Sequence, residues 1–335
     1  MTAWPISQDA ATLHRSALVW DNHVCLPHVH EEKWMMDLLR HQQAGANIVL
    51  VNLGDAEIPF EEQVSMANYY RTWILRHPDK MLLIETPADI RKAAENNLLG
   101  VAFDVEGLYS IEDRIERVAL YYELGVRWML MAYNKNNLAA GGCHDDDQGL
   151  TPYGYQVIAE MDRLGMVKCC THTGYKSVMD VMTNTDKPTI FSHSNPRGLK
   201  DHPRNIPDEL IVASAKTGGV ICINGVSLFL GEGEGAACAA RIADHIQYVV
   251  DLVGDDHVGL GLDHVYDMEG MFDELAKSRD IWPADLGYSE GIKIAGPEEL
   301  PLITDELIKR NMSEDAIRKI LGGNLVRVAD QVWQS

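Results

Sequence analysis

Short apolar runs alternate with longer amphipathic stretches along most of the chain. Eight of these runs are bounded by turn-forming residues, as buried strands are, and they cover residues 17–24, 46–54, 99–107, 126–134, 166–173, 189–195, 219–225 and 257–265. The stretches between them repeat apolar residues at helical spacing, as in 59–77, 111–124 and 154–165. Strands that alternate with helices pair in parallel, so the pattern predicts a parallel α/β fold.

Eight strand and helix units in one chain predict a (β/α)8 barrel, the TIM barrel. A doubly wound sheet more often has fewer strands and a glycine-rich first turn, and neither GxGxxG nor GxxxxGK[ST] occurs in the sequence. We therefore expect a single catalytic domain over residues 1–335. Residues 266–301, rich in Gly, Pro and acidic residues, are expected to form a loop insertion near the barrel mouth. Residues 302–335 are expected to form C-terminal helices, with Thr304 and Ser313 as N-caps.

Polar side chains gather at the predicted carboxyl ends of the strands. In a barrel these ends lie on one face, so residues far apart in the sequence can meet there. The clearest cases are His172 and His193, each of which closes an apolar run. The other strands deliver Asp21, His23, Cys25, Asn52, Asp104, Glu106, Tyr133, Asn134, Asn224, Asp263 and His264. Burying so many polar groups without partners would cost several kcal/mol each, so we expect a metal site.

The balance of charges limits the partners to expect. The chain has 335 residues, of which 29 are basic and 50 acidic, and its formal net charge is -21. Such a charge disfavours binding to phosphate backbones or to anionic membranes through a basic face. We therefore expect a small-molecule substrate, and neither nucleic acid nor a membrane as partner.

Two further features bear on the cellular compartment. Residues 1–20 lack the basic start and apolar core of a secretory signal, and no window reaches the roughly 18 uninterrupted apolar residues of a membrane helix. The six cysteines are scattered and mostly lie in apolar runs, which is typical of free thiols rather than disulfides. We therefore expect a cytoplasmic protein.

The residue types at the strand ends suit Zn²⁺, which binds imidazole nitrogen, thiolate sulfur and carboxylate oxygen. A metal with an open coordination position would lower the pKa of a bound water toward ~7. Glu106 could bridge two such ions, which together would also polarise a carbonyl under attack. Asp263 could move a proton between the water and a departing amine. With Glu106 and Asp263 as catalytic residues, the predicted reaction is hydrolysis of an amide or a similar bond.

Short segments spread over nearly the whole chain resemble one known family. They are DNHVCLP at 21–27, FDVEG at 103–107, GLTPYG at 149–154, RLGM at 163–166, TH at 171–172, IFSHS at 190–194, DHPRN at 201–205, TGGVI at 217–221 and LGGNLVR at 321–327. In these segments the chain resembles the membrane (renal) dipeptidase family, peptidase family M19, of zinc hydrolases with amidohydrolase-like barrels. The resemblance implies a metallo-dipeptidase with one or two Zn²⁺ per chain, and it suggests a homodimer.

The resemblance also implies the metal ligands. Glu106 resembles the carboxylate that bridges the two metals. His172 and His193 resemble the ligands of one zinc, and His23 resembles a ligand of the other.

Two more residues match positions that act on the substrate. Asp263 resembles the acid/base aspartate, and Arg204 resembles the arginine that binds the substrate carboxylate. The parallel N–H donors of a guanidinium match a planar carboxylate, which is an independent physical reason for the second assignment. A structural salt bridge is the alternative for Arg204.

The chain departs from the family pattern at two positions. Where the family has an aspartate two residues after the first histidine, this chain has Cys25, which could hold a second zinc as a thiolate or leave that site weak as a neutral thiol. Where the family usually has a substrate-binding histidine, the chain has Tyr133, whose hydroxyl can donate a similar hydrogen bond. Because of these two changes, two alternatives to a dipeptidase remain open. One is an amidohydrolase acting on another small amide or N-acyl amino acid, and the other is a catalytically weak relative that binds a metabolite.

Overall fold

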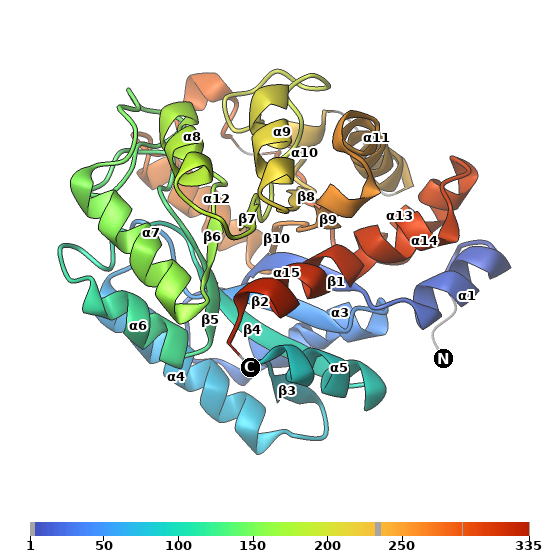
Figure 1. The fold of residues 1–335 in the computed structure, drawn as a ribbon. Coiled ribbons are helices and arrows are strands. Elements are labelled where there is room, and N and C mark those ends of the chain that lie inside the picture. Colours follow the sequence, from blue (N-terminus) through green and yellow to red (C-terminus); the bar gives the residue numbers. More distant parts are fainter. Residues whose placement is uncertain (1–3, 232–235, 290, 335) are drawn as a thin grey trace.

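The computed structural model describes residues 4–231, 236–289 and 291–334. Within these residues ten strands join in one sheet at the centre of the molecule, and helices surround it (Figure 1). The strands are β1 (Trp20–Cys25), β2 (Ile48–Asn52), β3 (Met81–Leu83), β4 (Leu99–Val105), β5 (Val126–Leu130), β6 (Val167–Cys169), β7 (Thr189–Ile190), β8 (Ile221–Ile223), β9 (Val258–Leu260) and β10 (His264–Val265).

Eight of the described strands form a closed ring. They follow the order β7-β6-β5-β4-β2-β1-β9-β8 with parallel neighbours, and a parallel bridge between Phe191 and Ile221 joins the two ends of this series. Outside the ring, β3 pairs with β4 and β10 pairs with β1. The (β/α)8 barrel expected from the sequence is therefore confirmed.

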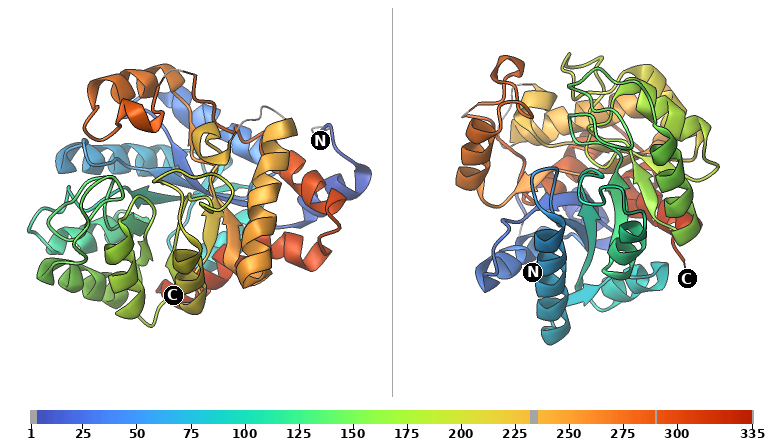
Figure 2. Two further views of the ribbon diagram at one scale, coloured as in Figure 1. Left: turned by 90° about the horizontal axis from the view of Figure 1, so that it is seen from above. Right: turned by 90° about the vertical axis from the view of Figure 1, so that its left-hand side faces the viewer.

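Most helices lie in an outer layer around the strands (Figure 2). They are α1 (Gln8–Ser16), α2 (Glu32–Asp37), α3 (Leu39–Gln43), α4 (Phe60–Arg76), α5 (Pro87–Glu95), α6 (Glu116–Glu123), α7 (Pro152–Leu164), α8 (Tyr175–Thr183), α9 (Asp208–Lys216), α10 (Ser227–Leu230), α11 (Ala236–Val253), α12 (Met268–Lys277), α13 (Glu299–Lys309), α14 (Glu314–Arg318) and α15 (Asn324–Val332). Two 3-10 turns, η1 (Asp255–His257) and η2 (Ala284–Leu286), and one π-helical turn, η3 (Lys319–Gly323), complete the series.

The observed strands are mostly shorter than the predicted ones. The predicted strand 166–173 is extended only over Val167–Cys169, and the predicted strand 189–195 only over Thr189–Ile190. The residues that follow each short strand leave the ladder and turn into the site described below. The sequence pattern does not predict β3, because a three-residue strand is too short to show a period.

One of the two predicted N-caps is wrong. Ser313 caps α14, where its side chain accepts the N–H of Ala316. Thr304 instead lies inside α13, whose N-cap is Glu298. The buried hydroxyl of Thr304 lies 2.7 Å from Nδ1 of His14 on α1, so a tertiary partner rather than a helix end satisfies it.

Two apolar layers hold the barrel together, and they follow the alternation of side chains along each strand. On β2, Ile48 and Leu50 join a cluster inside the barrel, whereas Val49 joins the layer between barrel and helices, and all three are fully buried. The amino-terminal end of the barrel is covered by the chain around α15. There the ring of Trp333 lies 6.0 Å from that of Trp20, the first residue of β1.

The segment 266–301 contains more regular structure than the loop expected from the sequence. It includes α12 and η2, and its side chains Met271, Leu275 and Trp282 join or pack against the interior cluster. The loop expectation follows from the frequent Gly, Pro and acidic residues of the segment, although the ten residues of α12 have apolar positions at helical spacing. The segment forms part of the wall at the carboxyl ends of the strands.

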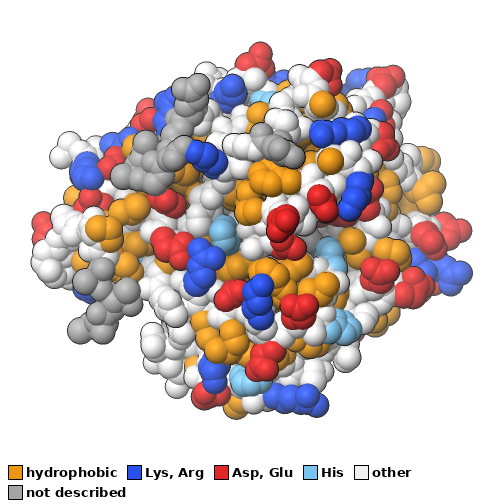
Figure 3. Space-filling view, turned by 180° about the vertical axis from the view of Figure 1, so that it is seen from behind, with side chains coloured by type: hydrophobic (Ala, Val, Ile, Leu, Met, Phe, Trp, Pro, Cys, Tyr) orange, Lys and Arg blue, Asp and Glu red, His pale blue; other side chains and the backbone are white. Residues whose placement is uncertain are grey.

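The cysteines and the molecular surface can also be compared with the expectations from the sequence. All six cysteines are free thiols, as expected. Among the described helices, none has both the length and the apolar character needed to cross a bilayer. On the face shown in Figure 3, acidic and basic side chains are interspersed over the described surface.

Candidate active site

A buried carboxylate lies at the centre of the site. Oε1 of Glu106 lies 3.2 Å from Nε2 of His193 and 3.6 Å from Nε2 of both His23 and His172. These residues lie on or just after four different strands, β1, β4, β6 and β7. Glu106 is only 4% exposed, and its Oε1 has no hydrogen-bond partner among the described residues. The structure thus brings together four side chains that are up to 170 positions apart in the printed sequence.

Two of the imidazoles point lone pairs at this carboxylate. Nε2 of His172 and Nε2 of His193 lie 3.1 Å apart. The outer nitrogens have partners, because Nδ1 of His172 lies 2.7 Å from Oδ1 of Asn134 and Nδ1 of His193 lies 3.0 Å from the hydroxyl of Ser192. Burial lowers the pKa of both histidines well below its ordinary value, so both rings are neutral. With each Nδ1 proton donated outward, two nitrogen lone pairs and a carboxylate oxygen meet.

Three acceptors at this spacing fit a divalent metal ion. The ligand atoms of Glu106, His172 and His193 all lie within 4.8 Å of one another. Acceptors that have lost their water repel one another unless a positive charge lies between them. The orphaned Oε1 of Glu106 is the atom that such a charge would satisfy, and imidazole and carboxylate are common metal ligands.

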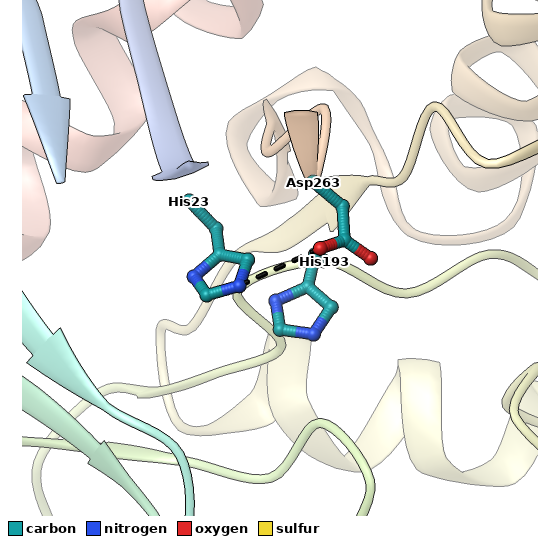
Figure 4. A group of neighbouring side chains, drawn as sticks. All are labelled: His23, His193 and Asp263. Atoms are coloured by element: carbon teal, nitrogen blue, oxygen red, sulfur yellow. Dashed lines mark ion pairs between the residues drawn. The ribbon is translucent and has the colours of Figure 1, made fainter. Parts of the chain in front are cut away.

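A second group of candidate ligands shares His23. Sγ of Cys25 and Oδ1 of Asp263 each lie 3.5 Å from its Nε2, and Figure 4 shows Asp263 pointing toward the ring. On the far side of the ring, Nδ1 of His23 lies 3.2 Å from Oδ2 of Asp104, whose Oδ1 accepts an N–H of Asn52 at 2.9 Å. A carboxylate behind the ring fixes its orientation, as it does for many metal-binding histidines.

The charges around His23 and Cys25 also favour a cation. Burial lowers the pKa of His23, but Asp104, Glu106 and Cys25 outweigh burial and raise that pKa well above its ordinary value. Burial raises the pKa of the Cys25 thiol to about 12, although His23 opposes this. A metal cation would be attracted by the same carboxylates in place of these protons, and a coordinated thiol is deprotonated.

Three residues of the site have a left-handed backbone. Asn134, His172 and Asp263 have φ angles of 58°, 61° and 61°. Such a conformation costs a non-glycine residue about 1–3 kcal/mol and persists where surrounding contacts hold it. One of these contacts is the 2.8 Å hydrogen bond from the amide of Asn224 to Oδ2 of Asp263. The strained turns aim the side chains away from the strand ladder and into the site.

A cavity of about 290 Å³ opens beside the candidate ligands. Ligand pockets usually measure roughly 300–1,000 Å³, so this one suits a small molecule. Most of its wall is apolar or aromatic, with contributions from Phe229, Trp282 and Tyr288. Arg204 and Tyr133, two residues predicted from the sequence to bind substrate, also line it.

Arg204 is a buried cation without an anion. It is 3% exposed, and its guanidinium carbon lies 5.1 Å from the centre of the Phe229 ring. Its Nε has no hydrogen-bond partner, and its guanidinium forms no ion pair with any carboxylate of the described residues. Arg204 therefore forms no structural salt bridge within the described residues, which was the alternative to a role in substrate binding. The donors of Arg204 are available to an anion in the cavity.

Tyr133 lies flat against one of the candidate ligands. Its ring centre is 4.3 Å from that of His172 in a stacked arrangement, and Trp282 packs edge-on against it at 5.3 Å. Burial and the nearby carboxylate of Glu106 raise the pKa of Tyr133 well above its ordinary value, so the phenol keeps its proton. Gly107 has φ +100°, and a Cβ on it would lie 3.2 Å from that of Tyr133. Glycine here lets the tyrosine approach the carboxylate.

A comparison with known protein families identifies the family of the chain. The family described as membrane dipeptidase (peptidase family M19) matches residues 31–280. The chain belongs to this family. The matched range contains Glu106 and the candidate residues that follow it, while His23 and Cys25 of β1 precede it.

Individual relatives of this M19 protein agree with the family. The dipeptidase verJ of Clonostachys rogersoniana is 29% identical over 266 residues, which are 78% of this chain and 62% of that protein. The crystal structure of an amidohydrolase from Pseudomonas aeruginosa is 31% identical, with a TM-score of 0.85 and coverage of 97% and 99% of the two chains. The probable dipeptidase PvdM from Pseudomonas aeruginosa has the same fold, with 20% identity, a TM-score of 0.82 and coverage of 97% and 98%. The chain spans 51% to 62% of the lengths of five curated dipeptidases.

Sequence reasoning misses part of this M19 cavity. Asp55, which lines it, directly follows the second predicted strand and could be found by the same strand-end rule. Glu274 and Trp282 also line it, but they come from segment 266–301, where the sequence leads us to expect a loop rather than α12. No local signal in the sequence identifies these two residues.

One strand-end histidine stays outside the site. His264 directly follows Asp263, and its Nδ1 lies 3.1 Å from the carbonyl oxygen of Ala295. Burial lowers the pKa of His264 to about 4, so it is a neutral, hydrogen-bonded histidine of the barrel wall.

The contact between Asn134 and His172 predicts how metal binding responds to mutation. Asn134→Ala removes the acceptor that orients the ring, and losing such an outer partner typically weakens metal binding by about 10–100-fold. Competition with a chromophoric chelator measures this loss. The control is Asn311→Ala, which changes an exposed asparagine with the same left-handed φ of 58° and should leave metal affinity unchanged. Equal metal affinity in wild type and Asn134→Ala would contradict the arrangement described.

Proposed function

We propose that this chain is a zinc-dependent dipeptidase that hydrolyses the peptide bond of small dipeptides. One observation carries the proposal: two imidazole nitrogens and a carboxylate oxygen converge beside a cavity that also holds a buried arginine without an anion. The first feature suits a metal that activates water, and the second suits the carboxylate end of a peptide. Membership of the M19 family and the dipeptidase names of curated relatives support this function.

Zinc is the metal that this set of side chains suits best, because imidazole, thiolate and carboxylate are all its usual ligands. Glu106, His172 and His193 would hold one ion. His23 and Cys25, together with Glu106, would hold a second. Bound zinc supplies Lewis acidity, which makes a water molecule acidic near neutral pH and polarises a carbonyl group.

Protein side chains perform the remaining steps of the proposed reaction. Arg204 binds the C-terminal carboxylate of the dipeptide through parallel N–H donors and so fixes the scissile bond in place. Tyr133 donates a hydrogen bond to the carbonyl oxygen as negative charge develops there. Asp263, held through Oδ2 by Asn224, takes a proton from the attacking water and delivers it to the departing amine nitrogen.

A second candidate function is hydrolysis of another small amide, such as an N-acyl amino acid. Such a substrate has the same carboxylate for Arg204 but no α-ammonium group. Tyr133, which replaces the histidine of the family pattern, and the relative described as an amidohydrolase favour this candidate.

Metal removal tests the proposed function directly. Treatment with a chelator should abolish turnover of a dipeptide panel, and added Zn²⁺ should restore it. Glu106→Gln should lower kcat/KM by at least about 10²-fold, since it removes the carboxylate that both groups of ligands share, whereas the exposed control Glu95→Gln should not.

Other outcomes of this experiment identify the alternatives. Dipeptide turnover that survives complete metal removal would exclude the proposed mechanism. Turnover of N-acyl amino acids alone would indicate the amidohydrolase. Tight ligand binding without any turnover by the zinc-loaded protein would indicate a metabolite-binding relative.

The role of Cys25 is tested by spectroscopy rather than by activity. In the Co²⁺-substituted protein a thiolate ligand should give a sulfur-to-metal charge-transfer band, and Cys25→Ser should remove it. Cys238→Ser, which changes a buried thiol on α11, should leave the band intact. A wild-type spectrum without the band would show that Cys25 is not a ligand.

The role of Arg204 is tested with paired substrates. Arg204→Lys removes the bidentate donors and should lower kcat/KM for a dipeptide by about tenfold or more, which corresponds to about 1.4 kcal/mol. It should change kcat/KM much less for the corresponding dipeptide amide, which has no carboxylate. Arg163→Lys, at a side chain that is 64% exposed, is the control. Equal losses for both substrates would argue against carboxylate recognition by Arg204.

A further inference from the structure

Three carboxyl groups of the cavity have no role in the proposed mechanism, and one of them, Asp267, caps α12 by accepting a backbone N–H of that helix. Asp55 directly follows Gly54, whose carbonyl oxygen accepts the backbone N–H of Glu106 at 3.0 Å, so Asp55 lies close to the metal-binding residues. Glu274 lies on α12. The side chains of Asp55 and Glu274 both line the cavity, both are half-buried, and Asp55 lies close enough to Glu274 to act on its charge. Together they form the Asp55–Glu274 pair.

The pair holds a proton where a cation would fit. Among the described residues, no basic side chain forms an ion pair with either carboxylate, and Lys277 on the same helix is 76% exposed and pairs with Asp273 at 3.7 Å. Burial and the nearby Asp55 raise the pKa of Glu274 to about 8. A protonated Glu274 beside a second carboxyl group can exchange its proton for a positive group, which then interacts with two carboxylates.

Asp55 and Arg204 follow strands on opposite sides of the barrel and line one cavity. Asp55 extends from the end of β2 and Arg204 from the loop after β7, and these two strands are four places apart in either direction round the eight-stranded ring. Arg204 is 3% exposed, has an Nε without a partner and lines the same cavity, which independently indicates a ligand there. A ligand with its carboxylate on Arg204 therefore extends past the metal-binding residues toward the Asp55–Glu274 pair.

We propose that the Asp55–Glu274 pair is a subsite for a basic side chain, so that the preferred dipeptides have lysine or arginine as the amino-terminal residue. The inference rests on the proposed dipeptidase function. With the C-terminal carboxylate on Arg204, the positive group belongs to the amino-terminal residue.

The position of the pair favours the side chain of that residue over its α-ammonium. The α-ammonium is two bonds from the carbonyl carbon and must lie among the metal-binding residues. Neither Asp55 nor Glu274 belongs to any of the described groups of potential ligand atoms that lie within 4.8 Å of one another. The pair is therefore available to the part of the ligand beyond the α-carbon.

The chemistry of the pair selects for charge. An ammonium or guanidinium group can donate hydrogen bonds to both carboxylates while the shared proton leaves to solvent. A neutral side chain of the same shape would remove water from these carboxyl groups and could offer them only uncharged, weaker hydrogen bonds. The pair therefore favours basic side chains in two ways, because it attracts a positive group and disfavours neutral side chains.

The test compares arginyl-alanine with citrullyl-alanine, which have nearly the same shape and differ in charge. In the zinc-loaded wild type, kcat/KM for the arginyl peptide should exceed that for the citrullyl peptide by about tenfold or more. The double variant Asp55→Asn, Glu274→Gln should reduce this ratio to near one. The control Asp273→Asn changes a neighbouring carboxylate on α12 that is 73% exposed, and it should keep the wild-type ratio.

Three results would overturn the proposal. The first is a wild-type ratio of the two kcat/KM values near one, and the second is a ratio that the double variant leaves unchanged. The third is an equal loss of kcat/KM for both peptides in the double variant, which would assign the pair to the α-ammonium. Hydrolysis of neutral dipeptides without a preference for arginine would reject this subsite and leave the dipeptidase function intact. If neither peptide is hydrolysed, the proposed dipeptidase function is rejected. The subsite is then tested by binding, because the ratio of the calorimetric Kd values of the two peptides replaces the ratio of their kcat/KM values.

Discussion

The structure depends on keeping one carboxylate and three imidazoles in contact inside an apolar barrel. Oε1 of Glu106 lies within 3.6 Å of Nε2 of His23, His172 and His193, and none of the four residues is more than 5% exposed. Groups that have lost their hydration and face one another as acceptors repel unless a positive charge lies between them. The strand ends of the barrel hold the four groups in this arrangement, and a metal cation between them would relieve the repulsion.

Each of the three imidazoles has a second contact at its other ring nitrogen. Asp104 orients His23, Asn134 orients His172, and the short strands give way to turned segments so that these contacts can form. The left-handed backbone of His172 is part of the same arrangement, because it directs the ring out of the strand ladder and toward Glu106. The cost of this local strain is therefore offset by the tertiary contacts that hold each side chain in place.

The sequence predicts most of the barrel and the convergence of its strand ends, because both follow from local patterns. Eight apolar runs imply eight buried strands, and a polar residue that closes a run, such as His193, must lie on the face where parallel strands end. The position of Thr304 inside α13 and the length of β7 depend on contacts made elsewhere in the fold, so the sequence predicts them wrongly. The sequence does not identify Glu274, because its helix lies in a segment that its Gly, Pro and acidic residues mark as a loop, and because Asp55 is distant in the sequence.

The cavity combines two parts of different origin. The metal-binding residues and Arg204 come from the barrel strands and the loops that follow them, whereas Glu274 and Trp282 come from segment 266–301. In a barrel of this type the strands fix the chemistry, and residues on loops and added helices can change without moving the strand ends. Both departures from the family pattern, Cys25 and Tyr133, lie among the residues at the strand ends. Cys25 belongs to one group of candidate metal ligands and Tyr133 stacks on a member of another, whereas Glu274 lies on α12. Substrate choice can therefore vary in this fold while the metal-binding geometry stays the same.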